Sequence, residues 1–169
     1  MPEDRKQEGL YKVQSVRFNS TIEVLKSFIK GIWVDADKEE EITRQYIEMM
    51  DTKTPSQEQL IGNLSGGNQQ KVMIGRWLAT APKILILDEP TRGVDVGAKS
   101  EIYAIMNELV KKGVSIIMIS SELPEILNMS DRVYVMCDGR ITGCFSHEEC
   151  VTQEPVSYTH LTLPTILLV

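Results

Sequence analysis

The chain has 169 residues, of which 42% are hydrophobic, and its formal net charge is −6 at pH 7. This length suffices for one domain with a buried core, and the composition is ordinary for a globular protein. This net negative charge does not suggest the basic surface that binds nucleic acid.

The sequence also lacks the usual signs of membrane insertion and of disulfide bonding. No apolar run approaches the ~20 residues of a membrane-spanning helix, and the charged N-terminus has no apolar core of a signal peptide. The cysteines Cys137, Cys144 and Cys150 show no CxxC spacing. We expect reduced thiols, as in a cytoplasmic protein.

Two helical segments are predicted in the first third of the chain. Apolar residues recur at helical spacing through residues 21–51, in two stripes that are interrupted at Gly31 and at residues 35–37. Pro55, in the polar loop 52–56, is expected to stop the second helix. The first twenty residues begin without a cap, strand or turn, so we expect the chain to be the C-terminal part of something longer.

Residues 64–71 (LSGGNQQK) predict a glycine turn followed by a helix that ends before Pro82. Ser65 supplies a hydroxyl, Gly66 and Gly67 let the backbone approach a ligand closely, and the helix adds its positive N-terminal end. Such a turn can bind a phosphate. A simple N-cap with a flexible turn is the alternative.

Residues 84–87 (ILIL) predict a strand buried on both faces, which ends at Asp88 and Glu89. The strand carries Asp88 to the edge of the sheet where ligands of open α/β sheets bind. There Asp88 can hold Mg²⁺, directly or through a water. Glu89 can polarise the water that attacks a γ-phosphate. A surface turn is the alternative, and the apolar run before it disfavours that.

The rest of the chain predicts alternating helices and strands. They are a helix at 98–112 that ends at Gly113, a strand at 114–119, a helix at 122–129, a strand at 132–137 and its hairpin partner at 140–145. This order predicts an α/β layer with a mostly parallel sheet.

Residues 155–169 are neither periodic nor capped and resemble translated adapter DNA, so we treat them as a non-native tail. A genuine short C-terminal strand is the alternative.

The order of these motifs resembles the ATP-binding subunits of ABC transporters. Residues 64–68 look like the family signature, residues 84–89 look like Walker B, and residues 93–95 lie where the D-loop lies. Residues 91–99 (TRGVDVGAK) resemble the monosaccharide importers whose ATPase subunit is two fused nucleotide-binding domains, and the match is to the second domain.

The resemblance covers residues 2 to about 154 and implies part of a P-loop NTPase domain. Residues 1–63 would hold the end of the Q-loop region and a helical subdomain. Residues 64–154 would hold the signature helix and the C-terminal α/β part.

No complete P-loop, GxxxxGK[ST], occurs in the chain. The nearest candidate, residues 93–100, has Ala98 where the second glycine belongs, and it follows a loop instead of a strand. We expect Lys99 to be a solvated residue in the first turns of a helix. The chain thus lacks its own main phosphate cradle, and the isolated polypeptide is expected to be inactive.

Two positions depart from the family pattern. Glu3 stands where most such domains have the Q-loop glutamine. Ser121 stands where they have the switch histidine, and a serine cannot carry a positive charge near neutral pH. The resemblance therefore implies slow or no hydrolysis at this half's own site.

The resemblance also implies how the residues are used. ABC domains work in head-to-tail pairs, with ATP and Mg²⁺ between them. Asp88, Glu89 and Ser121 would serve one site. The signature residues Ser65, Gly66, Gly67 and Asn68, with Asp95 of the D-loop, would act in trans on ATP held by the partner domain.

The implied partners are an upstream nucleotide-binding domain of the same full-length chain, membrane permease subunits and, indirectly, a periplasmic or extracellular sugar-binding protein. The implied location is peripheral, on the cytoplasmic face of the membrane.

Three further readings stay open. This half could bind nucleotide without turning it over. The chain could belong to a soluble ABC protein of DNA repair or translation, against which the acidic balance and residues 91–99 count. The polypeptide could also be a fragment with no independent activity. Ribose, galactose, xylose and related pentoses or hexoses stay open as substrates, because specificity in such transporters resides in the binding protein and membrane subunits.

Overall fold

The computed structural model describes residues 9–150 and the backbone of residues 165–168. The chain divides into two compact units, Met1–Lys83 with Thr91–Ile105, and Ile84–Pro90 with Met106–Val169. The signature helix groups with the N-terminal helices in the first unit, and the division at residues 63 and 64 stays a prediction. Each unit is described by itself.

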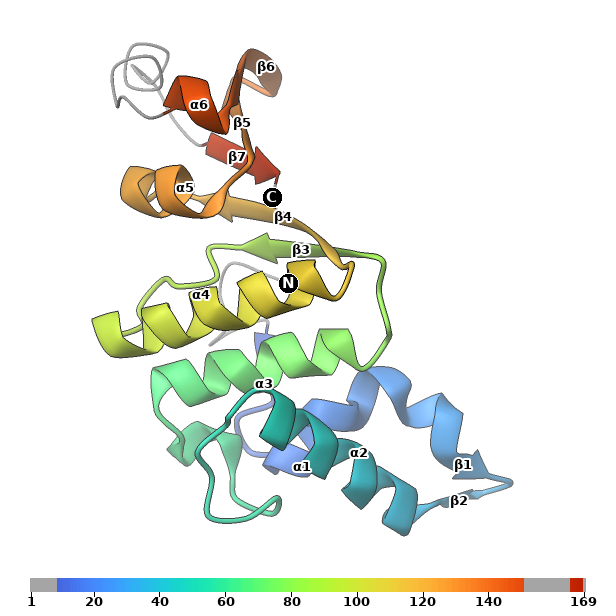
Figure 1. Cartoon of the computed structure of the whole chain (residues 1–169). Helices are drawn as coiled ribbons and strands as arrows, with labels where there is room; N and C mark the ends of the chain where they lie inside the picture. The colour runs from blue at the N-terminus through green and yellow to red at the C-terminus, as the bar shows by residue number, and fades with distance from the viewer. Residues whose placement is uncertain (1–8, 151–164, 169) are drawn as a thin grey trace. The chain divides into compact units, whose positions relative to one another are not determined.

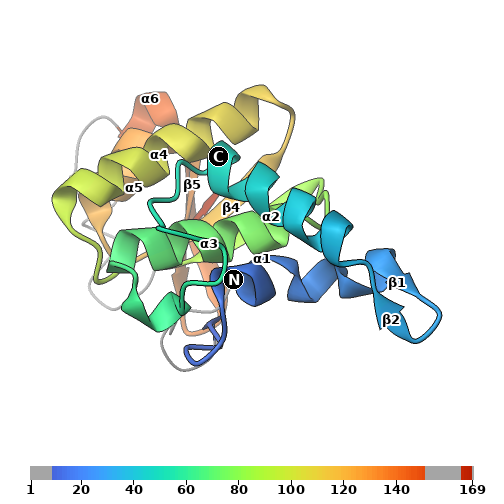
Figure 2. The same cartoon turned by 90° about the horizontal axis from the view of Figure 1, so that it is seen from below.

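The first unit is mainly helical. Its elements are α1 (Val16–Thr21), η2 (Ile22–Phe28), β1 (Ile29–Lys30), β2 (Trp33–Val34), α2 (Ala36–Met49), η3 (Ile61–Asn63), α3 (Gly66–Leu78) and the start of α4 (Val96–Lys111). Helices α1, α2 and α3 pack against one another (Figures 1 and 2). Each begins at a residue whose side chain accepts a bond from the first turn: Ser15, Asp35 and Ser65.

The predicted helical region 21–51 contains a hairpin that the sequence analysis missed. Strands β1 and β2 pair antiparallel, with Ile29 opposite Val34, and Gly31 between them has a φ of +64°. Glycine adopts this left-handed conformation without a steric penalty, so the chain reverses there. Helix α2 then ends at Met49, before Pro55, so the prediction that Pro55 stops this helix is wrong.

A buried apolar cluster fixes the position of α3. Its members come from the N-terminal segment, α1, η3 and α3: Leu10, Val16, Ile61, Val72 and Met73. Burying one such side chain contributes about 1.5–3 kcal/mol. Two members lie in the middle of α3, and Leu64, just before its N-cap Ser65, packs against the same cluster, so the cluster holds both the helix and its start.

The second unit is built on a five-stranded sheet. Its elements are β3 (Ile84–Asp88), the end of α4, β4 (Ser115–Ser120), α5 (Leu123–Met129), β5 (Arg132–Cys137), β6 (Arg140–Ser146), α6 (His147–Cys150) and β7 (Thr165–Leu168). The strand order is β3-β4-β7-β5-β6. β3 and β4 are parallel, and β7 is antiparallel to both β4 and β5. Strands β3, β4 and β5 therefore share one direction, and the α/β prediction is confirmed.

Two features of this sheet differ from the predictions. Leu85 and Leu87 are buried, whereas Ile84 and Ile86 on the opposite face of β3 are 58% and 51% exposed. Side chains alternate between the two faces of a strand, and among the described residues only one face of β3 is covered. The prediction that this strand is buried on both faces is therefore wrong. At the C-terminus, the alternative of a short strand matches β7, and the rest of 155–169 lies outside the described residues. A non-native origin of the tail stays a prediction.

Among the helices in the described ranges, none is both long and apolar enough to cross a membrane.

Candidate functional site

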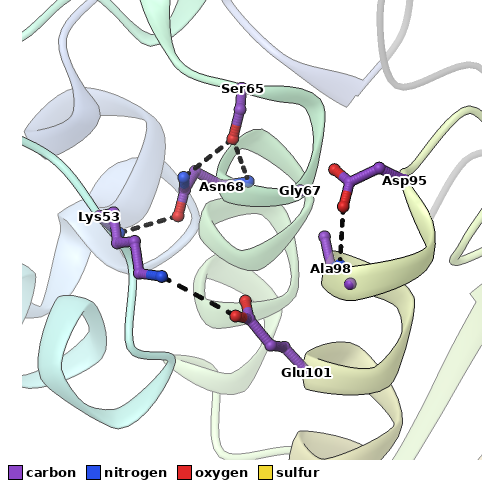
Figure 3. A pocket seen from close by; sticks show the side chains of 8 residues that line it. Lys53, Ser65, Gly67, Asn68, Asp95, Ala98 and Glu101 are labelled. Carbon is purple, nitrogen blue, oxygen red and sulfur yellow. Dashed lines mark hydrogen bonds and ion pairs between the residues drawn. The ribbon is translucent and has the colours of Figure 1, made fainter.

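A pocket of about 240 Å³ lies at the N-terminal end of α3 in the first unit (Figure 3). It is lined by Lys53, Ser65, Gly67, Asn68, Asp95, Gly97, Ala98 and Glu101. The structure thus brings together three predicted signature residues and Asp95, which the sequence separates by about thirty positions. Gly66 lies between two of these residues, as the first residue of α3.

The hydroxyl of Ser65 is held in one orientation by Asn68. Its oxygen accepts hydrogen bonds from the Asn68 amide Nδ2 at 2.9 Å and from the Asn68 backbone N–H at 3.4 Å. A serine oxygen has two lone pairs and one proton. With both lone pairs engaged, the remaining capacity of Ser65 is to donate its proton, which suits an anionic ligand.

The two glycines are the first residues of α3, not a turn before it as predicted. Backbone N–H groups in a first helical turn have no partner within the helix, so they can meet an anion there. Gly67 is buried, and a Cβ added to it would lie 2.5 Å from the Cβ of Ala98. Gly67 is therefore required for the close approach of α3 to the start of α4.

Asp95 lies on the other side of this pocket and caps α4. Its Oδ1 accepts a hydrogen bond from the Ala98 N–H at 3.0 Å (Figure 3). Gly93, with a φ of +67°, turns the chain just before this cap. The P-loop candidate at 93–100 is thus a turn and a helix start, and it does not follow β3 directly. Lys99 lies in the first turn of α4, as predicted.

A charged cluster behind the pocket was not predicted. The Lys71 side chain is 1% exposed, and its Nζ lies 2.8 Å from Glu101 Oε2 and donates to the Asp51 carbonyl at 2.8 Å. The hydrogen bond from Lys71 and its charge lower the pKa of Glu101. This contact ties α3, α4 and the end of α2 together around the pocket.

Lys53 connects the loop after α2 to the same site. Its backbone N–H donates to Asn68 Oδ1 at 2.8 Å, and its Nζ lies 3.9 Å from Glu101 Oε1 (Figure 3). The sequence does contain a signal for Lys71 and Glu101. Lys71 follows Gly67 by one helical turn, and Glu101 follows Gly97 in the same way, so each lies on the same helix face as a pocket residue. Lys53 lies in a loop, and no such spacing indicates it.

The second unit brings Asp88, Glu89 and Ser121 together at the C-terminal ends of β3 and β4. Asp88 ends β3 and pairs in register with Ile119. The Glu89 N–H donates to the Ile119 carbonyl at 2.8 Å, and its carboxylate accepts from the Ser121 N–H at 2.8 Å. The predicted switch position thus meets the predicted catalytic carboxylate through its backbone.

A buried pair next to Ser121 was also missed. The Ser120 hydroxyl donates to the Glu125 carboxylate, and both side chains are buried. Ser120 Oγ in turn accepts a bond from the Glu122 N–H at 3.1 Å. These bonds hold the turn between β4 and α5, which carries Ser121.

The donor set at Asp88 and Glu89 fits Mg²⁺ bound together with a nucleotide. In the described ranges no group of three or more His, Cys, Asp or Glu side chains could hold a metal. Mg²⁺ commonly uses one or two carboxylates and completes its shell with water and substrate phosphates. Half-buried Asp88, at the end of a strand, would supply such a carboxylate. Glu3, the predicted Q-loop position, lies outside the described residues.

Comparison with known proteins agrees with these features. The family model described as ABC transporter matches residues 2–92. The chain is 50% identical to the ribose import ATP-binding protein RbsA of Rhodopirellula baltica, over 90% of this chain. It is 51% identical to the xylose import ATP-binding protein XylG of Moorella thermoacetica, over 91% of this chain. It spans only 30% of the length of each relative.

Solved structures share the fold. An ATP-binding cassette of an ABC transporter matches with a TM-score of 0.74 at 29% identity, over 89% of this chain and 64% of that one. An ADP conformation of such a cassette matches with a TM-score of 0.71 at 31% identity, over 90% and 64%. The resemblance seen in the motifs is confirmed: this chain belongs to the ABC transporter family.

Proposed function

We propose that this chain is part of an ATPase that energises the import of a monosaccharide across the cytoplasmic membrane. The relatives are named as import ATP-binding proteins for ribose and xylose, and another, from Pectobacterium atrosepticum, for arabinose. In the full-length protein this part would lie on the cytoplasmic face, bound to membrane permease subunits. A sugar-binding protein outside the membrane would be an indirect partner.

The observation that carries the proposal is the pocket at the start of α3. It presents the Ser65 hydroxyl as a donor and the free N–H groups of a thirteen-residue helix. The helix dipole adds positive potential at the same end. Such fixed donors stabilise charge on a γ-phosphate without reorganisation during the reaction.

The ATP that this pocket meets would be held by another domain. The chain has no GxxxxGK[ST] sequence to cradle a nucleotide's phosphates itself. We infer that Ser65, Gly66, Gly67 and Asn68 act in trans, with Asp95 at the same interface. The partner is an upstream nucleotide-binding domain of the same protein, and the isolated 169-residue chain is inactive.

This half's own site would use the cluster at the ends of β3 and β4. Asp88 would hold Mg²⁺, and Glu89 would orient the attacking water. Ser121 supplies a backbone N–H to Glu89 but no group that can carry a positive charge near the γ-phosphate. We expect slow hydrolysis here, so the two sites of the full-length protein would be unequal.

Two substitutions in the full-length protein test this assignment. Ser65→Arg should abolish ATPase activity and sugar uptake, because a large side chain blocks the pocket. Glu89→Gln should do less damage, since this half's own site is weak. The asymmetric assignment is wrong if Glu89→Gln eliminates turnover while Ser65→Arg is silent.

A second candidate is a half that binds nucleotide and never hydrolyses it. The exposed Ser121 at the switch position favours this reading. A single-turnover assay on full-length protein, with the other domain's catalytic residue disabled, separates the two. Release of inorganic phosphate from this half supports a slow enzyme, and complete retention of ATP supports a binding module.

A further inference from the structure

We propose that Lys53 is a phosphate-binding residue of the pocket at the start of α3. The ligand chemistry is the triphosphate of the nucleotide that the proposed function places there, so this inference rests on that function. Lys53 would add a mobile positive charge to donors that are otherwise neutral backbone and hydroxyl groups.

Two carboxylates and one lysine line the pocket. Asp95 and Glu101 both line it, and carboxylates repel a nucleotide phosphate. Lys53 is the one lysine or arginine among the lining residues of this described pocket. A polyphosphate entering here would meet the Asp95 carboxylate, the Glu101 carboxylate that Lys71 already balances, and the Lys53 ammonium.

Glu101 does not depend on Lys53 for its counter-charge. Its Oε2 lies 2.8 Å from the Nζ of buried Lys71, whereas its Oε1 lies 3.9 Å from the Nζ of Lys53. The Lys53 side chain is 72% exposed, so its contact with Glu101 is weak in water. Lys53 can leave Glu101 for a phosphate, and Lys71 would still neutralise the carboxylate.

The backbone of Lys53 is nevertheless fixed relative to the signature residues. Its N–H donates to Asn68 Oδ1, and the amide of the same Asn68 donates to Ser65 Oγ. One asparagine therefore links the hydroxyl donor to the base of the lysine side chain. Figure 3 shows Lys53, Asn68 and Ser65 along one side of the pocket. This link keeps a flexible ammonium within reach of the site where Ser65 donates.

The first test measures KM and kcat for ATP in the full-length protein. Lys53→Gln should raise KM about tenfold, the expected loss of one hydrogen bond to a charged group. Lys53→Arg should keep KM near the wild-type value. Lys112→Gln removes the same charge from an exposed site at the end of α4 and is the matched control.

The outcomes separate the two proposals. A KM for Lys53→Gln equal to that of Lys112→Gln overturns the role of Lys53, and the proposed function stands if Ser65→Arg still abolishes turnover. A silent Ser65→Arg overturns the trans role that the proposed function gives to this pocket.

A second measurement needs no substitution. The exposed Lys53 amine should react with acetic anhydride in the nucleotide-free full-length protein. ATP with Mg²⁺ should slow the acetylation of Lys53 at least several-fold. The acetylation rate of Lys112 should be the same with and without ATP. Equal acetylation of Lys53 with and without ATP would contradict the assignment.

Discussion

The backbone N–H of Ser121 donates to the carboxylate of Glu89 at 2.8 Å. Glu89 itself has a φ of +46°, a left-handed conformation that is uncommon for a residue with a side chain. Its own N–H donates to the Ile119 carbonyl in β4, so the backbone of Glu89 is anchored to that strand and its carboxylate to the residue that follows it. The Ser121 side chain takes no part in the bond to Glu89, and it can be exchanged without losing it.

Ser121→His should therefore increase hydrolysis at this half's own site. The substitution keeps the bond from residue 121 to Glu89 and adds an imidazole that can be charged near neutral pH. We expect at least a tenfold rise in single-turnover hydrolysis, toward the ~10²–10⁴-fold typical of one acid–base group. The assay uses full-length protein whose other site is disabled.

Ser121→Ala is the matched control for that experiment. It removes the hydroxyl and keeps the backbone N–H, so hydrolysis at this site should stay at the wild-type rate. A tenfold loss in Ser121→Ala would show that the hydroxyl itself matters. An unchanged rate in Ser121→His would contradict the role given to the missing histidine.

Gly67→Ala should impair ATPase activity through a steric clash with Ala98. The added Cβ would lie 2.5 Å from the Ala98 Cβ, and the next nearest atom, Val94 Cγ1, is 3.8 Å away. Displacing α3 by even about 1 Å can cost ~10²-fold in rate. Steady-state ATPase measurements on full-length protein would show the loss.

The double variant Gly67→Ala with Ala98→Gly separates this clash from other effects. Removing the Ala98 methyl leaves ordinary contact distances around the new Cβ, so activity should return to within a few-fold of wild type. If the double variant is as impaired as Gly67→Ala, the clash with Ala98 does not explain the need for glycine.

The Lys71–Glu101 pair should make stability depend on acid pH. Lys71 lowers the pKa of Glu101, so the folded state favours the charged carboxylate. The stabilisation is present above the ordinary glutamate value of ~4.3 and is lost as the pH falls through the lowered pKa. Glu101→Gln should lower the midpoint temperature of thermal unfolding at pH 7. The difference in midpoint between variant and wild type should shrink as the pH falls toward 3.

Glu108→Gln is the control, because it also removes a glutamate–lysine ion pair, but one whose lysine is exposed to solvent. Glu108 lies 2.7 Å from Lys111, whose side chain is 72% exposed, whereas Lys71 is 1% exposed. An exposed pair adds little stability, so Glu108→Gln should change the midpoint much less. Equal shifts in the two variants would mean that burial of Lys71 has no effect.

Ile61→Ala should loosen the start of α3. Ile61 is fully buried in the cluster that holds Val72 and Met73. Such a truncation costs about 2–5 kcal/mol. Hydrogen exchange of the α3 amides in the full-length protein should accelerate accordingly. Leu60→Ala, at a neighbouring residue that is 46% exposed, should leave this exchange nearly unchanged.

The sequence alone determined the family, the α/β class and most of the second unit. Strands β4, β5 and β6 and helix α5 lie within one or two residues of their predicted bounds. Their signals are local: apolar runs, Pro124 in a first turn, and an Asp138-Gly139 turn with positive φ at both residues. Local backbone preferences and side-chain periodicity suffice for such elements.

Only the tertiary structure decided the contacts that make the pocket. Lys53, Lys71 and Glu101 come from a loop and two helices, and their distances depend on how those helices pack. Packing also decided that Gly67 serves a close approach to Ala98, and that Ser121 meets Glu89 through its backbone. Contacts between residues distant in sequence follow from the shared core and not from any spacing within one segment, so a single sequence does not reveal them.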